Sequence, residues 1–147
     1  MKSERDFRNY LAGAALAFGI VLLSSQILQL VFGGNSVEAG SELYTLIVNI
    51  YLAAHLVGGF AGGFLVARVK GKDFIQVGTV TGIMAYIFET IYNVVFESAM
   101  TDIYAAVSLL IGGIVGAMFF RARSEKERIA SKKPEEPKPA PEEPKKE

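Results

Sequence analysis

Two ionisable side chains, Glu89 and His55, lie within long apolar stretches of this 147-residue sequence. A charge at the centre of a membrane-spanning helix costs roughly 3 kcal/mol on insertion scales, so a carboxylate in such a stretch is a candidate for function. A carboxylate and an imidazole can exchange a proton or bind a cation. The alternative is structural, because the same groups can join helices through hydrogen bonds.

Other polar side chains fall at a similar depth if the apolar stretches are helices that cross a bilayer. At a rise of about 1.5 Å per residue, Glu89 lies roughly 22 Å from the basic end of its helix, and Gln26 and Asn49 lie at about 24 and 25 Å. His55 is nearer the middle, on a helix face rotated by about 120° from Asn49. Asn93 follows Glu89 by one turn on a stripe of small and polar residues that should face other helices. These five residues form the candidate intramembrane polar site.

Signatures of enzymes and of metal centres are absent from the sequence. The chain has no cysteine and a single histidine, which excludes disulfides and cysteine-ligated metals and leaves too few imidazoles for a histidine metal site. It has no zinc-protease, serine-hydrolase, phosphate-loop or dinucleotide-binding motif. We therefore expect no catalytic residues, no cofactor and no nucleic-acid partner, and anionic lipid explains the basic loops.

Four apolar stretches, at residues 10–32, 43–66, 74–96 and 103–120, must position the polar side chains. Each is long enough to cross a bilayer as a helix, and none has the alternation of a membrane β-strand. Lys and Arg gather before the first stretch, between the second and third, and after the fourth, whereas the other two connections have none. By the positive-inside rule, this places both termini of a multi-pass cell-membrane protein in the cytoplasm. The predicted fold is all-α, an antiparallel bundle of four transmembrane helices.

Polar segments flank the predicted membrane domain, which spans residues 10–120. Residues 1–9 should form a cytoplasmic N-terminal segment. Residues 121–147 are rich in Pro, Glu and Lys and should form a disordered cytoplasmic tail, because they have too little apolar surface to bury. Within this tail, residues 125–129 are compatible with an extension of the fourth helix.

Small residues recur at a spacing of four, which stacks them on one helix face. Such rows let helices approach closely in a membrane. They could form a dimerisation surface or pack the bundle internally, and the sequence favours internal packing. The pairs are Gly58 and Gly62, Gly59 and Gly63, Gly78 and Gly82, Gly112 and Gly116, and Ala15 and Gly19.

The glycine-rich segment 58–63, which leads into Ala67, Arg68 and a short turn, resembles small prokaryotic four-helix integral membrane proteins of uncharacterised function. This resemblance covers residues 10–120 and implies a fold but no activity. Small multidrug-resistance transporters are also four-helix proteins with a membrane-embedded glutamate. Their essential carboxylate lies in the first helix, where this chain has Gln26 and two serines, and this difference counts against that family.

Two functions from different classes fit these observations. The first is a non-enzymatic four-helix membrane protein that acts as a homo-oligomer or as a subunit of a larger membrane assembly. The alternative is a small transporter or channel for protons, cations or small solutes that uses Glu89.

Overall fold

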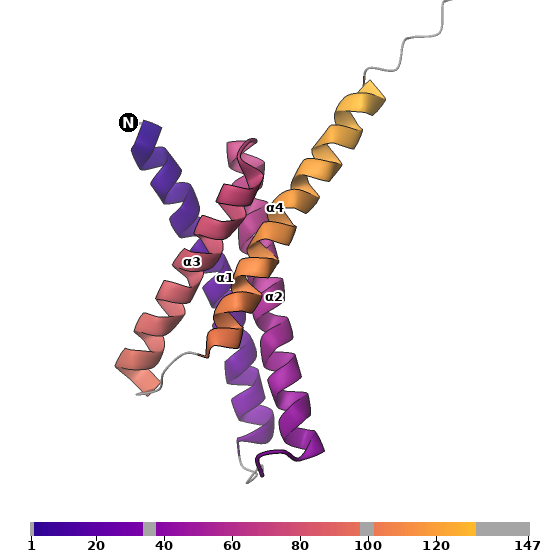
Figure 1. The fold of residues 1–147 in the computed structure, drawn as a ribbon. Coiled ribbons are helices and arrows are strands. Elements are labelled where there is room, and N and C mark those ends of the chain that lie inside the picture. Colours follow the sequence, from indigo (N-terminus) through magenta and orange to yellow (C-terminus); the bar gives the residue numbers. More distant parts are fainter. Residues whose placement is uncertain (1, 34–37, 98–101, 132–147) are drawn as a thin grey trace, which may run out of the picture.

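The computed structural model describes residues 2–33, 38–97 and 102–131, and these residues are almost entirely helical. The elements in chain order are α1 (Lys2–Phe32), α2 (Glu42–Lys70), α3 (Phe74–Tyr92), a short π-helix η1 (Asn93–Glu97) and α4 (Ile103–Ser131) (Figure 1). All four α-helices are long and apolar enough to cross a membrane. The described part of the chain contains no strand, which confirms the predicted all-α fold of a polytopic membrane protein.

The helices alternate in direction, so each end of the bundle gathers parts of all four. The beginning of α1, the turn between α2 and α3, and the end of α4 all lie toward the top of Figure 1, spread apart from one another. We call this the basic end, defined by Arg68, Lys70, Lys72, Arg121 and Arg123. The opposite end, with the connections from α1 to α2 and from α3 to α4, is the loop end.

Local signals explain where α2 begins and ends. The side chain of Ser41 accepts a hydrogen bond from the backbone N–H of Tyr44, which caps the first turn of α2. At the other end, Gly71 has a φ of 66° and its N–H donates to the carbonyl of Ala67. A left-handed backbone conformation at this position is favourable for glycine. It allows a tight turn from α2 into α3.

The outer helices continue beyond the apolar stretches into charged sequence. The prediction of a disordered tail from residue 121 is wrong for residues 121–131, which form the last turns of α4, whereas the extension of the fourth helix through residues 125–129 is confirmed. Two ion pairs at the helical i, i+4 spacing support them, Arg121 with Glu125 at 2.9 Å and Arg123 with Glu127 at 3.1 Å. Similarly, α1 begins at Lys2, inside the expected N-terminal segment. The part of the predicted tail at 132–147 lies outside the described residues.

Each glycine row of α2 packs against a different neighbouring helix. A methyl group added to Gly58 would approach the carbonyl of Ala17 in α1 to 2.7 Å, and one added to Gly62 would approach the carbonyl of Gly13 to 2.5 Å. On the adjacent row, methyl groups added to Gly59 and Gly63 would collide with backbone atoms of α4. The helix is thus held by backbone contact on two sides.

The glycines of α3 and α4 complete this close packing. Methyl groups added to Gly112 or Gly116 would collide with backbone carbonyls of α2, and those added to Gly78 or Gly82 would approach the backbone of α4 within 3 Å. The parallel helices α2 and α4 form the most extensive interface of the bundle. These glycine rows therefore pack the bundle internally.

The pair Ala15 and Gly19 behaves differently. Both residues are exposed, and a methyl group added to Gly19 would meet nothing within 4 Å. The face of α1 that packs internally carries Gly13, Ala14 and Ala17 instead. The prediction that Ala15 and Gly19 form a packed row is therefore not met within a single chain.

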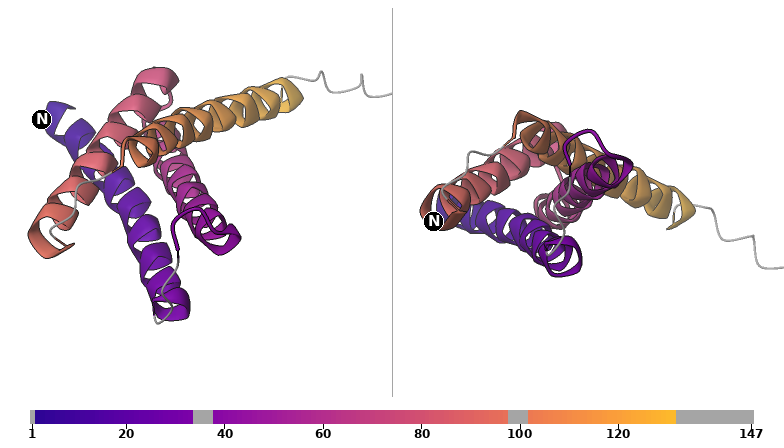
Figure 2. Two further views of the ribbon diagram at one scale, coloured as in Figure 1. Left: turned by 60° about the horizontal axis from the view of Figure 1, so that its bottom comes forward. Right: turned by 90° about the horizontal axis from the view of Figure 1, so that it is seen from below.

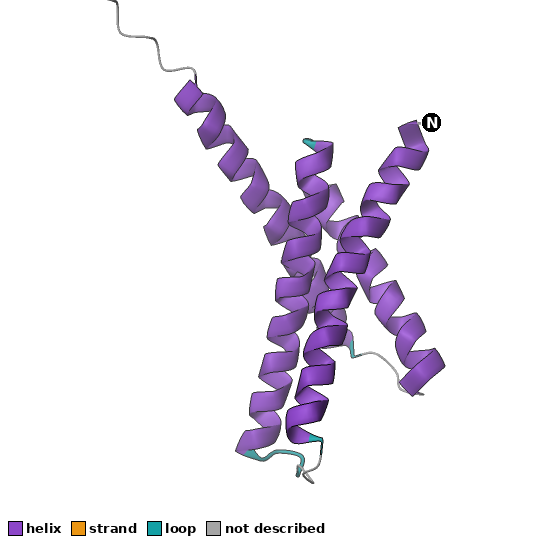
Figure 3. Ribbon diagram, turned by 180° about the vertical axis from the view of Figure 1, so that it is seen from behind, coloured by secondary structure: helices purple, strands orange, loops and turns teal. Residues whose placement is uncertain are grey.

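The four helices cross near their middles and diverge toward their ends (Figures 2 and 3). At the loop end α1 and α2 stay side by side, whereas α3 leaves them, as both Figure 1 and the view from behind in Figure 3 show. Two clusters of buried apolar side chains fill the crossing. One contains Ala14, Ala17, Val21, Ala85 and Leu109, and the other contains Val66, Ala67, Val77 and Ala117.

Candidate functional site within the membrane span

Glu89 lies on the buried face of α3, one turn before that helix ends. Only 3% of its surface is exposed, although it is one of the most polar residues within the four spans. Gly78, Gly82 and Ala85 share this buried face, which agrees with the stripe expected from the sequence. The small residues bring α3 close to α4, and Glu89 is thereby carried into the interior of the bundle.

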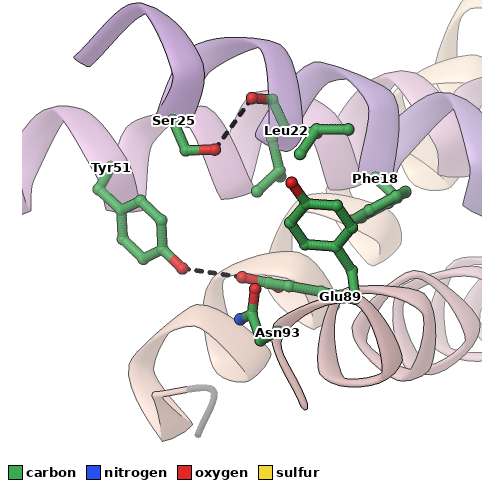
Figure 4. Close-up of a pocket in the computed structure, with 8 residues that line it drawn as sticks. Phe18, Leu22, Ser25, Tyr51, Glu89 and Asn93 are labelled. Atoms are coloured by element: carbon green, nitrogen blue, oxygen red, sulfur yellow. Dashed lines mark hydrogen bonds between the residues drawn. The ribbon is translucent and has the colours of Figure 1, made fainter. Parts of the chain in front are cut away.

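Two side chains of α2 contact the same oxygen of Glu89. The hydroxyl of Tyr51 donates a hydrogen bond of 2.8 Å to Oε1, and Nε2 of His55 lies 2.9 Å from that atom. Tyr51 and His55 are one helical turn apart, and their ring centroids are 4.2 Å from each other. Figure 4 shows the Tyr51 hydroxyl pointing to the carboxylate from the opposite wall of the site. The contact joins α2 to α3 through three polar groups.

The hydrogen bonds of His55 define where protons must be. Its Nδ1 lies 2.7 Å from the backbone carbonyl oxygen of Tyr51, and a carbonyl can only accept, so Nδ1 carries a proton. The contact between Nε2 and Glu89 Oε1 then needs one further proton, either on an imidazolium that faces a carboxylate or on a neutral carboxyl group that faces a neutral ring. In both forms the pair has no net charge. This is the form in which an acid and an imidazole are tolerated in a membrane interior.

The second carboxylate oxygen of Glu89 is left without a partner. Oε2 is buried and makes no hydrogen bond with the described residues. Glu89 lines a pocket of about 50 Å³. The other lining residues are Phe18, Val21, Leu22, Ser25, Tyr51, Tyr92 and Asn93 (Figure 4). A buried polar atom in a native fold normally has a partner, so Oε2 of this pocket-lining residue is a candidate acceptor for a water or a small ligand.

The backbone changes its hydrogen-bonding pattern directly after this site. The N–H of Asn93 is shared between the carbonyls of Glu89 and Thr90, and residues 93–97 form the π-helix η1. Short π-helical segments within α-helices frequently occur at functional sites, because they change the direction in which side chains point. Here the transition coincides with Asn93, which lines the pocket.

The structure brings together some of the residues selected from the sequence and separates others. Glu89 and His55 are in direct contact, and Asn93 lines the same pocket. Gln26 and Asn49 are exposed and do not line it, so the expectation that they join the cluster is wrong. Depth along the helix axis placed them well, but their rotation about that axis points them away from the bundle interior.

Tyr51 is a site residue that the sequence analysis did not select. It precedes His55 by four positions and therefore shares its helix face, which was the available signal.

The described residues contain no group of three or more His, Cys, Asp or Glu side chains that could hold a metal ion. The titratable groups around the pocket are those of Glu89, His55, Tyr51 and Tyr92. This arrangement can accept, hold and release a proton, or hold a small cation at Oε2.

The chain matches no protein-family model, no curated protein and no solved structure. The fold and the site define it as a polytopic all-α membrane protein with a buried acid and imidazole pair. Its function is therefore inferred from this geometry.

Proposed function

We propose that the protein is a small membrane transporter or channel that uses Glu89 to pass protons or small cations. The observation that carries this proposal is the unpartnered Oε2 of a nearly fully buried carboxylate at a pocket. A carboxylate kept only to join helices would be expected to use both oxygens, since an unsatisfied polar atom in an apolar interior is costly. Here one oxygen makes both contacts with α2 and the other is left for a ligand.

The pair with His55 suits a site that must load and unload. A lone carboxyl group could become a carboxylate only if its proton left the site. Beside His55, a proton can instead move between Oε1 and Nε2 while the pair stays neutral. Binding of a cation at Oε2 would favour the form in which the proton is on the ring. The two protonation forms thereby couple occupancy of the pocket to the position of one proton.

We also propose that the protein is not an enzyme. The hydroxyl of Ser25, which lines the pocket, donates to the carbonyl of Leu22 at 2.9 Å rather than to His55. The pocket therefore provides an acid and a base but no activated nucleophile.

The direct test is ion flux into liposomes that contain the purified protein. Proton and ammonium uptake, followed with an internal pH-sensitive dye, should be measured for the wild type, Glu89→Gln and Glu42→Gln. Glu42 is an exposed carboxylate in the first turn of α2, so the same chemical change there serves as the matched control. We expect Glu89→Gln to reduce flux to the level of protein-free liposomes and Glu42→Gln to retain it. Wild-type flux no greater than that of empty liposomes, or full flux in Glu89→Gln, would contradict the proposal.

Orientation is part of the proposal. Lys and Arg at the basic end favour its placement in the cytoplasm of the cell membrane, with both termini on that side. The loop end, toward which Asn93 and the pocket lie, would then face outward.

A second candidate function is assembly with copies of itself or with other membrane subunits. One specific observation favours it, namely the exposed small residues Ala15 and Gly19 on α1, which no other helix in the described part of the chain covers. The test is the mass of the protein in detergent, measured by light scattering, for the wild type and Gly19→Leu. A loss of oligomer in this variant would support assembly through α1, and a wild-type monomer would exclude a homo-oligomer.

A further inference from the structure

The polar lining of the pocket at Glu89 lies on one side of the carboxylate. Its other polar lining residues, Ser25, Tyr51, Tyr92 and Asn93, all lie further toward the loop end than the contact between His55 and Glu89. The pocket also lies between α1 and α3, where these helices diverge toward that end (Figures 1 and 4). The polar surface thus runs from Glu89 toward the loop end.

On the other side of Glu89 the bundle is tightly packed and apolar. The buried face of α3 continues toward the basic end as Ala85, Thr81 and Val77, none of which has exposed surface. The hydroxyl of Thr81 donates its proton to the carbonyl of Val77, within its own helix. Opposite this face stand Ala17 of α1 and Leu109 of α4, which are also fully buried.

Close backbone contact extends this barrier. Next to Thr81 on α3, Gly78 stands against Gly113 of α4, and Gly13 of α1 stands against Gly62 of α2. Beyond them the cluster of Val66, Ala67, Val77 and Ala117 fills the bundle up to the basic end. From Glu89 to the start of α3, this packed region is about 22 Å long at 1.5 Å per residue.

We infer that, in this conformation, Glu89 exchanges its ligand with water at the loop end only, and that the ligand is a compact hydrogen-bond donor. This inference rests on the proposed function, because it names the access route and the ligand class of the same site. Oε2 can only accept when the carboxylate is ionised, so it selects a donor such as hydronium carried by water or an ammonium-sized cation.

The size of the pocket sets this ligand class. One water molecule needs roughly 10–15 Å³ of cavity volume, so a pocket of about 50 Å³ holds only a few water molecules. An ammonium ion is close to water in size and fits, whereas a tetramethylammonium ion is larger and has no N–H to donate. Drug-sized solutes are excluded, because their pockets measure about 300 Å³ or more.

The absence of cysteine makes the route directly testable by single cysteine substitutions. Ser25→Cys reports the pocket, and Thr81→Cys reports the barrier with a nearly isosteric change on the buried face of α3. Gly40→Cys and Lys72→Cys report the loop end and the basic end. Each variant is reconstituted in oriented vesicles and treated on one side with a charged, membrane-impermeant methanethiosulfonate reagent.

We expect Ser25→Cys to react from the side that labels Gly40→Cys and not from the side that labels Lys72→Cys. Thr81→Cys should react on the order of tenfold more slowly from either side, because thiolate chemistry requires access to water. Ammonium at millimolar concentration should slow the labelling of Ser25→Cys, and tetramethylammonium should not. If ammonium has no effect while labelling is still one-sided, ammonium is excluded as the ligand and the access route stands.

Two results would overturn this inference. One is labelling of Ser25→Cys from the basic side, and the other is no labelling of Ser25→Cys from either side while Gly40→Cys reacts. Slowing by tetramethylammonium as strong as that by ammonium would overturn the ligand class. Since labelling needs no transport, a one-sided pattern without liposome flux would refute the proposed function and leave the access route standing.

Discussion

Nε2 of His55 lies 2.9 Å from Oε1 of Glu89, and these residues are 34 positions apart in the sequence. The contact closes the hairpin of α2 and α3 within the membrane. Because Nδ1 of the same ring is bound to the carbonyl of Tyr51, rotation of the ring would break both bonds. The carboxylate is therefore held in one position.

Removal of the imidazole should destabilise the protein more than neutralisation of the acid. In Glu89→Gln, an amide nitrogen in the place of Oε1 can donate one hydrogen to a neutral His55 and the other to the hydroxyl oxygen of Tyr51, so we expect a loss below about 1 kcal/mol. His55→Leu leaves a buried carboxyl group that keeps only the bond from Tyr51, and we expect a loss of about 2–3 kcal/mol. Unfolding in detergent micelles, followed by circular dichroism, measures both. Equal stability of His55→Leu and the wild type would show that the pair contributes nothing to folding.

Gly63→Ala should strongly destabilise the bundle. The added methyl group would collide with backbone atoms of Gly113 in α4, and backbone cannot move aside as a side chain can. We expect a loss of at least about 2 kcal/mol despite the higher helix propensity of alanine. The matched control is Gly19→Ala, at which nothing lies within 4 Å of the new methyl group, so its stability should equal or exceed that of the wild type. The prediction fails if the two variants unfold at the same temperature.

Lys70 fastens the beginning of α1 to the end of α2. Its ammonium group donates to the hydroxyl of Tyr10 at 3.1 Å, lies 4.5 Å from the centre of that ring, and is 3.3 Å from Oδ2 of Asp6. The carboxylate of Asp6 is 44% exposed, so solvent screens much of its attraction and the tyrosine contacts should dominate. Lys70→Met should therefore cost about 1 kcal/mol.

The location of this loss can be measured by hydrogen exchange. Amides in the first turns of α1 should exchange faster in Lys70→Met and should be unchanged in Lys72→Met, which removes an exposed lysine two positions away. Tyr10→Phe keeps the ring beneath the ammonium group and should give a smaller increase. If the amides of α1 exchange at the same rate in all three variants, the contacts of Lys70 do not stabilise the start of α1 in solution.

The orientation of the bundle can be checked with the same cysteine variants in intact cells. Gly40→Cys should react with an impermeant maleimide added outside, and Lys72→Cys should react only after the cells are opened. Reaction of both positions from one side would contradict four membrane crossings. If only Lys72→Cys reacts from outside, the protein has the opposite orientation in the membrane, and the four-helix fold is unaffected.

The four spans could be predicted because a bilayer imposes length and apolarity on each one separately. The stripe of Gly78, Gly82, Ala85 and Glu89 likewise follows from helical periodicity alone, and the structure buries all four residues. These features depend on local sequence. The extension of α4 to Ser131 was harder to foresee, since it depends on ion pairs between charged residues whose composition also fits a disordered chain.

The partners of Glu89 required knowledge that the sequence does not contain. Depth along the axis selected Gln26 and Asn49, but contact also depends on how each helix is rotated against its neighbours. That rotation is fixed by the glycine rows: Gly58 and Gly62 turn one face of α2 to α1, which carries Tyr51 and His55 toward α3 and leaves Asn49 exposed. A contact between helices can be deduced only after all the interfaces are known together.

The close glycine contacts between the crossing helices also provide a point about which these helices can rotate. Where Gly62 meets Gly13 and Gly78 meets Gly113, helices touch through bare backbone, without long side chains to interlock and resist a small rotation. A rotation of about 5° at Gly78 would displace Glu89, about 16 Å further along α3, by roughly 1.4 Å. The pocket at Glu89 and the packed basic end lie on opposite sides of these glycine contacts. A helix tilt that narrows the pocket would therefore loosen the packing at the basic end.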